Sequence, residues 1–545
     1  MRQQVRLGLL FIVLLFSANL FAQGGEIEDV EFIIEKDRKI EMPEIIRNFE
    51  KNNTALKPAP APKQTYSYKQ YTMDISPVEP KLRLVQLKQD PLEKLYPGYV
   101  RGGLGNYGST LFDVFINSKR TKDYAYGASF RHFASANGPV QNSGWSRNHL
   151  TGYGKYFLKK ATLEGDFTYG RERYNFYGYD QERFKDRATD SVRQVFNTVA
   201  FRTRLTNNKL DSITIYDAQL NFFNLADRYN AGEFEVQGLL NGSRKIDKTS
   251  SIELQSEISL SRYRDSSSIS RNLFRIRPTY HFQASGFGIE AGFNFVYTND
   301  TVGSKAHFYP ILKAAYDFIP GKLNLYAGLG GDMEKQLLRT HLAANPFLGP
   351  NQRVFHTNRF LDLYVGAKAT PISNLTVDAS LQFANYRWLP FYMNAGYDSS
   401  RLMIVYASGS SRVVRFNLSG LYQVSKEWQV GARMQLQSFS LDTLKRPYHT
   451  PTFQLAGFAR ASLSEKVLVY AELQYYNGMY ARTIQSKSEK KLPGFANLNL
   501  KMEYLISDRF SAFVEVDNAL NQKNPRFLYY PTRGILFLLG ATASF

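Results

Sequence analysis

The chain has 545 residues, a formal net charge of +20 and no cysteine. The lack of cysteine excludes disulfide bonds, thiolate metal sites and lipid attachment at a signal-peptide junction. Lys and Arg are scattered through turns and polar strand faces without forming a basic run, so the charge does not indicate nucleic-acid binding. Two uses of the charge remain open: a surface that faces anionic lipid or solute, and an ordinary solvated surface.

The first 22 residues have the pattern of a secretory signal peptide. Two arginines precede an apolar run at 7–16, which is too short to cross a membrane as a helix. Small residues follow, and the pattern predicts cleavage between Ala22 and Gln23. The mature protein is therefore expected to leave the cytoplasm.

Residues 23–97 differ in composition from the rest of the chain. Residues 26–51 are dense in charges of both signs, and residues 54–68 are rich in Pro, which is typical of an extended spacer. We expect a periplasmic or luminal arm in which residues 26–51 form a candidate docking peptide. A surface lipoprotein or a periplasmic protein is the expected kind of partner.

From Gly98 onward the sequence alternates between apolar and polar residues in segments of roughly 10 to 14 residues. The segment Ile252–Tyr263 is the clearest example, with Ile258 and Leu260 on one face and Glu257 and Ser259 on the other. Such a period of two predicts a β-strand with one apolar and one polar face.

This alternation indicates a β-barrel in a membrane, because lipid outside and water inside explain both faces at once. Hydrocarbon offers the backbone no hydrogen-bond partner, so only helices or a closed sheet can cross it. No apolar stretch after the signal reaches about 18 residues, which excludes membrane helices. A mean hydropathy of −0.36 agrees with a barrel, since half of its strand residues face water.

The sequence thus predicts an all-β fold over residues 98–545, a transmembrane antiparallel β-barrel of about 22 strands with short periplasmic turns and longer extracellular loops. This count takes residues 401–424 as one descending strand, interrupted near 408–411. The expected location is the outer membrane of a Gram-negative bacterium, with lipid, lipopolysaccharide and the assembly machinery of that membrane as surroundings. No nucleic-acid partner is expected.

Two sets of residues are candidates for contact with a solute. Charged residues on the polar faces of three predicted strands are candidate luminal contacts, and a hydrated interior network without a ligand is the alternative. An aromatic loop at 385–397 is a candidate sugar-stacking surface, and the alternative is an interfacial girdle. The luminal candidates are Glu253, Glu257, Arg275, Arg277, His281 and Glu290, and the loop candidates are Trp388, Phe391 and Tyr392.

Motifs of catalysis and of cofactor binding are weak in this sequence. Residues Gly103–Gly108 match the GxGxxG pattern. A segment of alternating apolar and polar residues follows, however, where a dinucleotide site needs a helix. The seven His residues form no zinc-binding pair on a helix, and no Gly-x-Ser-x-Gly elbow occurs. We therefore expect no catalytic, cofactor or metal site, and no enzyme.

The last strand ends the chain on an aromatic residue. Phe537, Ala543 and Phe545 share an apolar face, opposite small and polar residues such as Thr542. We expect this strand to close the barrel against the first strand, with the terminal Phe at the periplasmic interface. A terminal Phe in this position resembles the recognition signal of the outer-membrane assembly machinery.

The closing segment resembles the end of TonB-dependent receptor barrels, in the form common among Bacteroidetes. Matching features are an Asn-Leu-x-Asn type turn at 518–521, a Tyr-Pro loop at 530–531, an Arg-Gly pair at 533–534 and the terminal Phe545. The resemblance implies an outer-membrane protein that binds or transports a solute. It differs from the family in having only an arm before residue 98, too short for the usual plug, so energised import does not follow from it.

Two functions are consistent with this fold. The first is a transport barrel of the TonB-dependent receptor type without the plug, whose lumen is filled by the arm, by inward-folded loops or by a partner. The second is a non-transporting scaffold subunit that docks its partners through residues 26–51.

Overall fold

The computed structural model describes residues 95–184, 187–207, 213–300, 303–485 and 488–545. The predicted signal peptide with its cleavage site at Ala22 and Gln23 lies outside the described residues. Residues 23–94 of the predicted arm, with the candidate docking peptide at 26–51, also lie outside them.

The described part of the chain is almost entirely antiparallel β-sheet. The first half of the sheet contains β1 (Gly98–Gly105), β2 (Ser109–Asn117), β3 (Tyr124–Ser135), β4 (Trp145–Phe157), β5 (Ala161–Asn175), β6 (Arg193–Asn207), β7 (Thr214–Asp227), β8 (Gly232–Lys245), β9 (Ser250–Arg264), β10 (Ser268–Ser270), β11 (Asn272–Ala284) and β12 (Phe287–Asp300). The second half contains β13 (Gly303–Ile319), β14 (Leu323–Glu334), β15 (Thr357–Ile372), β16 (Leu375–Arg387), β19 (Ser411–Gln423), β20 (Trp428–Ser440), β21 (Phe453–Ser464), β22 (Val467–Asn477), β25 (Phe495–Leu505), β26 (Phe510–Asp517) and β27 (Leu536–Ser544).

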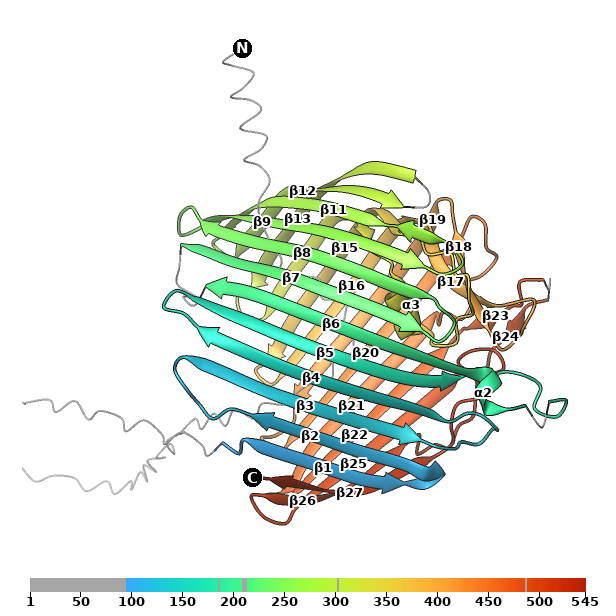
Figure 1. Ribbon diagram of the computed structural model, residues 1–545. Coiled ribbons are helices and arrows are strands. Elements are labelled where there is room, and N and C mark those ends of the chain that lie inside the picture. Colours follow the sequence, from blue (N-terminus) through green and yellow to red (C-terminus); the bar gives the residue numbers. More distant parts are fainter. Residues whose placement is uncertain (1–94, 185–186, 208–212, 301–302, 486–487) are drawn as a thin grey trace, which may run out of the picture. The chain divides into compact units, whose positions relative to one another are not determined.

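Each strand pairs with the next one along the chain, and the sheet curls into a barrel (Figure 1). The three-residue β10 pairs with β9 just before β11 does, so that 22 strands form the wall. The predicted antiparallel barrel of about 22 strands is confirmed. No helix in the described part of the chain is long and apolar enough to cross a membrane.

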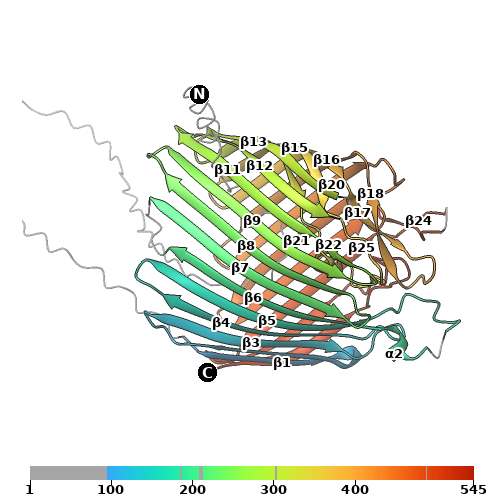
Figure 2. The same ribbon diagram turned by 45° about the horizontal axis from the view of Figure 1, so that its top comes forward.

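The barrel closes between its first and last strands, which lie side by side in Figures 1 and 2. The ladder runs from Tyr99 opposite Ser544 to Gly105 opposite Leu538. Beyond it, the Gly98 amide donates to the Phe545 carbonyl oxygen at 3.0 Å, and the Phe545 amide donates back at 2.9 Å. The chain therefore remains hydrogen-bonded to β1 up to its last residue.

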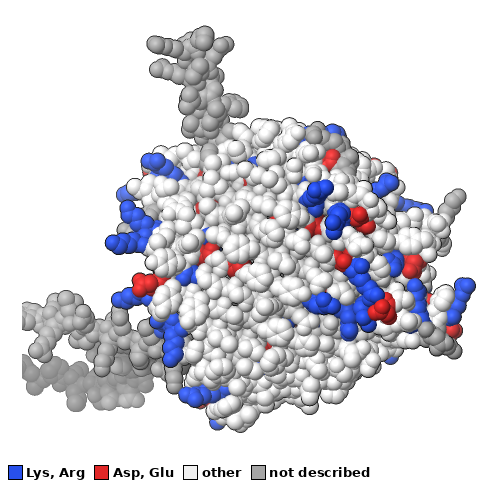
Figure 3. All heavy atoms as spheres, in the orientation of Figure 1, with Lys and Arg blue, Asp and Glu red and all other residues white. Residues whose placement is uncertain are grey.

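The alternation of the sequence becomes an apolar outer wall and a polar inner wall. On β9, Ile258 and Leu260 are 51% and 45% exposed on the outside, whereas Glu257 and Ser259 are 6% and 0% exposed on the inside. In Figure 3, the charged side chains on the visible face gather mainly toward the two ends of the barrel. A barrel with such an apolar band fits a bilayer, because its apolar side chains are more favourable in contact with lipid than in contact with water.

The two ends of the barrel differ in their connections. One end, which we call the turn end, has short turns such as 158–160, 285–286 and 373–374 and holds both Gly98 and Phe545. The other, which we call the loop end, has long connections with helices α2 (Thr189–Val192) and α3 (Leu338–Ala344) and the hairpins β17–β18 and β23–β24 (Figure 1). In outer-membrane barrels the turn end is periplasmic and the loop end extracellular.

The prediction of one descending strand over residues 401–424 is wrong. Residues Leu402–Ala407 form β18, which pairs with β17 (Leu389–Asn394) in a separate hairpin of the loop end. The barrel strand is β19 alone, and it pairs with β16 and β20. The apolar alternation of LMIVYA serves the packing of a loop, and a local pattern cannot distinguish this from a lipid-facing strand.

Candidate functional site

The six predicted luminal residues lie together on one part of the inner wall. The ladder between β9 and β11 places Arg275 opposite Glu257, and the ladder between β11 and β12 places His281 opposite Glu290. Neighbouring strands thus bring the charges of these faces within reach of one another. The set lies on β9 (Glu253 and Glu257), β11 (Arg275, Arg277 and His281) and β12 (Glu290).

Arg275 and Arg277 connect this wall to β14. Arg275 forms ion pairs with Glu257 at 2.5 Å and with Asp332 at 3.1 Å, and Arg277 reaches the same Asp332 at 3.1 Å. Asp332 also accepts a hydrogen bond from the Asn294 amide at 2.8 Å. Arg275 is therefore held by carboxylates from both sides, whereas Arg277 lies between the carboxylate of Asp332 and the side-chain oxygen of Gln255.

The other predicted luminal residues are paired as well. Glu290 binds Lys313 at 3.0 Å, and the imidazole of His281 lies 3.7 Å from Glu253. The inner wall is therefore a continuous network of opposite charges, and its contact with a solute stays a prediction.

The loop between β14 and β15 folds onto this wall and is held there by carboxylates of β8 and β9. The Lys335 ammonium lies 2.7 Å from Glu235 and 2.8 Å from Glu257, and Arg339 also pairs with Glu235. We call these three ion pairs the loop clamp. Glu235 and Glu257 point into the barrel, so the clamp places the start of this loop against the luminal wall.

A third carboxylate receives the beginning of α3. Glu233 of β8 accepts hydrogen bonds from the backbone amides of Leu338 at 2.7 Å and Arg339 at 3.1 Å. The first amides of a helix have no partner within the helix, and a carboxylate is well suited to them because of the helix dipole. The barrel wall thereby fixes the position of the helix.

Arg271, between β10 and β11, is almost completely buried at 1% exposure. Its guanidinium donates to the Asp300 carboxylate at 2.9 Å and to the backbone oxygen of Gln336 at 2.8 Å, and it lies 3.0 Å from Nδ1 of His356. A buried charge is tolerated only when it is paired and hydrogen-bonded. Arg271 therefore joins the barrel wall to both ends of the β14–β15 loop.

Four loop segments pack into one apolar cluster at the loop end. We call residues 176–179, 337–356, 388–407 and 527–530 the loop cap. Its core contains Phe347 and Tyr530, whose rings stack at 3.8 Å, and Tyr177, whose ring meets Tyr530 edge-on at 4.8 Å. The buried residues of this core are Leu348, Val354, Leu402, Ile404, Phe527 and Tyr530.

The three predicted loop contacts lie inside the loop cap. Phe391 is 2% exposed and meets Phe439 edge-on, and the Tyr392 hydroxyl lies 3.2 Å from Nδ1 of His341. The ring of Trp388 packs against Phe355 at 5.0 Å. Trp388 and Tyr392 thus join loop segments to one another, and Phe391 joins a loop to the barrel strand β20. The contact of all three with a ligand stays a prediction.

Two histidines of the loop end are held neutral by their surroundings. Burial lowers the pKa of His341 to about 3, with the positive charge of Arg271 as the smaller cause. Burial also lowers the pKa of His449 to about 4, and Nε2 of this residue lies 3.3 Å from the side-chain oxygen of Asn394. Protonation of either imidazole therefore opposes the packed arrangement.

The sequence analysis missed the carboxylates and cations of the loop clamp. Glu233 and Glu235 alternate with Phe234 and Val236, a pattern like that of Glu253 and Glu257, so the same signal was present there. Lys335 and Arg339 lie in a loop without periodicity, and no local pattern relates a loop to a strand that is distant in the chain.

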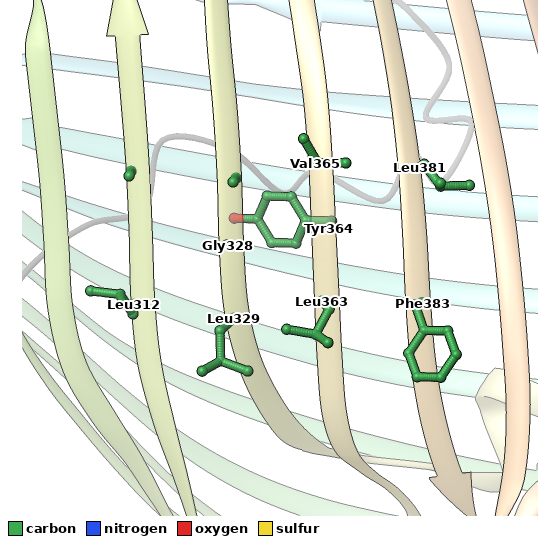
Figure 4. Close-up of a pocket in the computed structure, with 10 residues that line it drawn as sticks. Leu312, Gly328, Leu329, Leu363, Tyr364, Val365, Leu381 and Phe383 are labelled. Atoms are coloured by element: carbon green, nitrogen blue, oxygen red, sulfur yellow. The ribbon is translucent and has the colours of Figure 1, made fainter.

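One hollow of about 440 Å³ lies on the outer wall between β13 and β16 (Figure 4). Leu312, Val365 and Leu381 line it, and all three are exposed on the lipid-facing side. Its apolar lining fits an acyl chain rather than a polar solute. Among the residues that the structure describes, no group of three or more His, Asp or Glu could hold a metal ion.

No protein-family model and no curated protein matches this sequence. The fold is nevertheless similar to that of solved outer-membrane receptors. The ferric-catecholate import receptor Fiu from E. coli K12 has a TM-score of 0.64 at 12% identity, over 83% of this chain and 82% of that chain. The FrpB iron transporter from Neisseria meningitidis has a TM-score of 0.65 at 8% identity, over 83% and 82%. FpvA of P. aeruginosa, bound to pyoverdine, has a TM-score of 0.63 at 12% identity, over 83% and 72%.

At these identities the shared property is the fold. The neighbours are TonB-dependent receptors with 22-stranded barrels, in agreement with the resemblance seen in the closing segment. With its apolar band and its closed 22-stranded sheet, the chain is an outer-membrane β-barrel. The neighbours are receptors and transporters rather than enzymes. The Bacteroidetes-like form without a plug stays a prediction.

Proposed function

We propose that this protein binds a solute at its loop end and passes it across the outer membrane through the barrel lumen. Three features support the proposal: a wall of 22 strands, a charged and polar inner surface, and a likeness to receptor barrels. Barrels of this size enclose a lumen that must be blocked when no solute passes. The loop cap supplies such a block at the extracellular side.

The loop clamp is the observation that carries the proposal. The β14–β15 loop is attached to the luminal wall by Lys335 and Arg339, which bind Glu235 and Glu257. A charged or strongly hydrogen-bonding solute can compete for ion pairs, whereas it cannot replace an apolar core. In this proposal, solute binding releases the clamp and the loop moves away from the wall.

The solved neighbours suggest which solutes to test first. The names of Fiu, FrpB and FpvA refer to ferric catecholate, iron and pyoverdine. Ferric chelates carry charge and hydrogen-bonding groups, so they can compete with the loop clamp. They are the first candidates for this protein.

Single-channel recording in planar bilayers tests the proposal. The mature wild-type protein should conduct weakly, because the loop cap and clamp close the lumen. The double variant Glu235→Gln, Glu257→Gln removes the anionic half of the clamp while preserving size, and it should open far more often. The variant Glu427→Gln, in an exposed turn of the other end, is the matched control and should behave like the wild type.

A variant without residues 23–94 should be recorded in parallel, because the arm is a second candidate for blocking the lumen. Silence of the wild type, of the clamp variant and of the variant without the arm would contradict a transport path. If only the arm deletion conducts, the path exists but the loop clamp does not close it.

A further inference from the structure

The turns at the turn end of this barrel hold more exposed cations than exposed anions. The turns that follow β2, β4, β8, β13, β19, β21 and β25 all carry exposed Lys or Arg, and this side of the barrel is rich in basic side chains in Figure 3. We call these residues the basic collar. It consists of Lys119, Arg120, Lys122, Lys159, Lys160, Arg244, Lys245, Lys248, Lys322, Lys426, Lys466 and Arg509.

Several cations of the loop end, in contrast, are paired. Arg193 and Arg228 both bind Asp190 at 2.8 Å, and Lys445 and Arg446 bind Glu489 at 3.8 Å and 3.4 Å. Within the described ranges, none of the collar residues forms an ion pair with an acidic residue. These four loop-end cations therefore have ion-pair partners that the collar residues lack in the part of the chain that the structure describes.

Two acidic residues of the turn end accept hydrogen bonds within their own turns. Asp247 accepts hydrogen bonds from the backbone amides of Thr249 and Ser250, both at 2.7 Å. Glu427 accepts one from the hydroxyl of Ser425 at 2.7 Å. These carboxylates stabilise tight turns. The collar cations still outnumber the exposed acidic residues of the same turns, which are Asp123, Asp247, Glu427, Glu465 and Asp508.

Exposed aromatic residues mark where the collar meets the bilayer. Trp428, Phe510 and Phe545 are 43%, 54% and 59% exposed at the turn end. Aromatic rings of this kind lie at the level of the lipid headgroups. Two collar cations stand close to these rings in the chain: Lys426 is two residues before Trp428, and Arg509 directly precedes Phe510.

We propose that the basic collar binds the phosphate groups of anionic glycerophospholipids in the periplasmic leaflet of the outer membrane. The collar residues occur in turns spread along the strand order from β2 to β26, so they surround the barrel. A ring of charge matches an annulus of lipid, whereas a docked protein would need one continuous patch. Cations at a membrane surface attract anionic lipid over a distance of about one Debye length.

Fluorescence of Trp428 offers a local test of the proposal. The protein has three Trp residues, and Trp428 is the one at the turn end. It lies next to Lys426 and to the turn that holds Lys466. The full mature protein is reconstituted into phosphatidylcholine vesicles that contain brominated phosphatidylglycerol or brominated phosphatidylcholine as quencher. The variant Trp428→Phe gives the background from the two Trp residues of the loop end. The brominated anionic lipid should quench Trp428 at a mole fraction about fivefold lower than the zwitterionic lipid.

The double variant Lys426→Gln, Lys466→Gln should reduce this preference to within about twofold, and 1 M salt should do the same in the wild type. The control Lys445→Gln, Lys490→Gln removes two cations from the loop end and should leave the preference unchanged. Equal quenching by both lipids in the wild type would overturn the proposal and would leave the collar to an acidic protein partner. An unchanged preference in the Lys426 and Lys466 variant would overturn it as well.

Discussion

Single residues at the loop end show how strongly burial decides the role of a charged side chain. Arg271 lies in a short connection and is enclosed by Asp300, Gln336 and His356. Arg446, a few loops away, is also paired but remains exposed to water. The energetic value of the two ion pairs therefore differs, because solvent screens the second one.

Replacing Arg271 by Met should destabilise the folded barrel by about 3 kcal/mol or more, because Asp300 then remains buried without its partner. The loss can be measured as a lower temperature of the heat-dependent shift in gel mobility. Arg446→Met should change this temperature little. If the double variant Arg271→Met, Asp300→Leu is no more stable than Arg271→Met alone, the explanation by an unpaired charge is wrong.

Acidification should loosen the loop cap, which contains His341 and which His449 contacts from a neighbouring loop through Asn394 and Phe527. An unfolded loop binds protons on its histidines with an ordinary pKa near 6.5, whereas the packed loops lower these values to about 3 for His341 and about 4 for His449. Between these limits the open state binds more protons, so the stability of the cap is complete above about pH 6.5 and falls as the pH decreases toward 4.

Limited proteolysis of the loops between pH 4 and pH 7 measures this effect. Cleavage in the wild type should increase below about pH 6, and His449→Gln should show a weaker dependence on pH. A protease that is active throughout the range, with a denatured substrate as reference, corrects for the effect of pH on the enzyme itself. Equal cleavage at all pH values would contradict the prediction.

Among the elements, the seam between β1 and β27 leaves no space for a side chain at one of its glycines. A Cβ atom at Gly540 would overlap the carbonyl oxygen of Gly102 and the ring of Phe513. Glycine in a strand often marks such a close approach. Closure of the barrel thus depends on small residues on both sides of the seam as well as on the ladder.

The variant Gly540→Val should weaken the closed barrel by about 1–3 kcal/mol, because the added side chain has no space at the seam. The fraction of folded protein in outer-membrane preparations, read from heat-dependent gel mobility, is the measurement. Gly238→Ala on β8 is the control, since a Cβ there meets no atom within 4 Å. Equal folding of both variants would show that the seam tolerates a side chain.

At the scale of the whole molecule, the apolar outer band determines where the protein lies. Val365 and Leu381 lie in the middle of this band, at 55% and 48% exposure. These side chains would be unfavourable on the surface of a water-soluble protein, and lipid makes them favourable. The polar residues of the inner wall offset this apolar band, so that the composition of the whole chain resembles that of a soluble protein.

An arginine at position 365 should destabilise the barrel in a bilayer by about 2–4 kcal/mol, because it places a charge near the membrane midplane. The same change at Ile506, in the turn after β25, should cost about 1 kcal/mol or less. Unfolding in urea from lipid vesicles compares the two variants. A similar cost at both positions would contradict the assigned position of the bilayer.

Much of the architecture followed from the sequence. The period of two, as in Ile252–Tyr263, predicted strands, their lipid-facing sides and a closed barrel of about 22 strands, because a membrane permits few alternatives. The same period in Leu402–Ala407 was misleading, since loop packing also needs an apolar face. The partners proposed for residues 26–51, the contact with lipopolysaccharide and the role of Phe545, Ala543 and Phe537 in assembly stay predictions.

The sequence by itself determined which residues face lipid and which face the lumen, because the alternation of apolar and polar residues within each strand defines its two faces. Only the tertiary structure decided how the lumen is covered at the loop end and which charges are paired. Lys335 and Glu235 are 100 residues apart in the chain. Contacts over such a separation depend on the curvature of the whole sheet and the paths of its loops, and no local pattern contains that information.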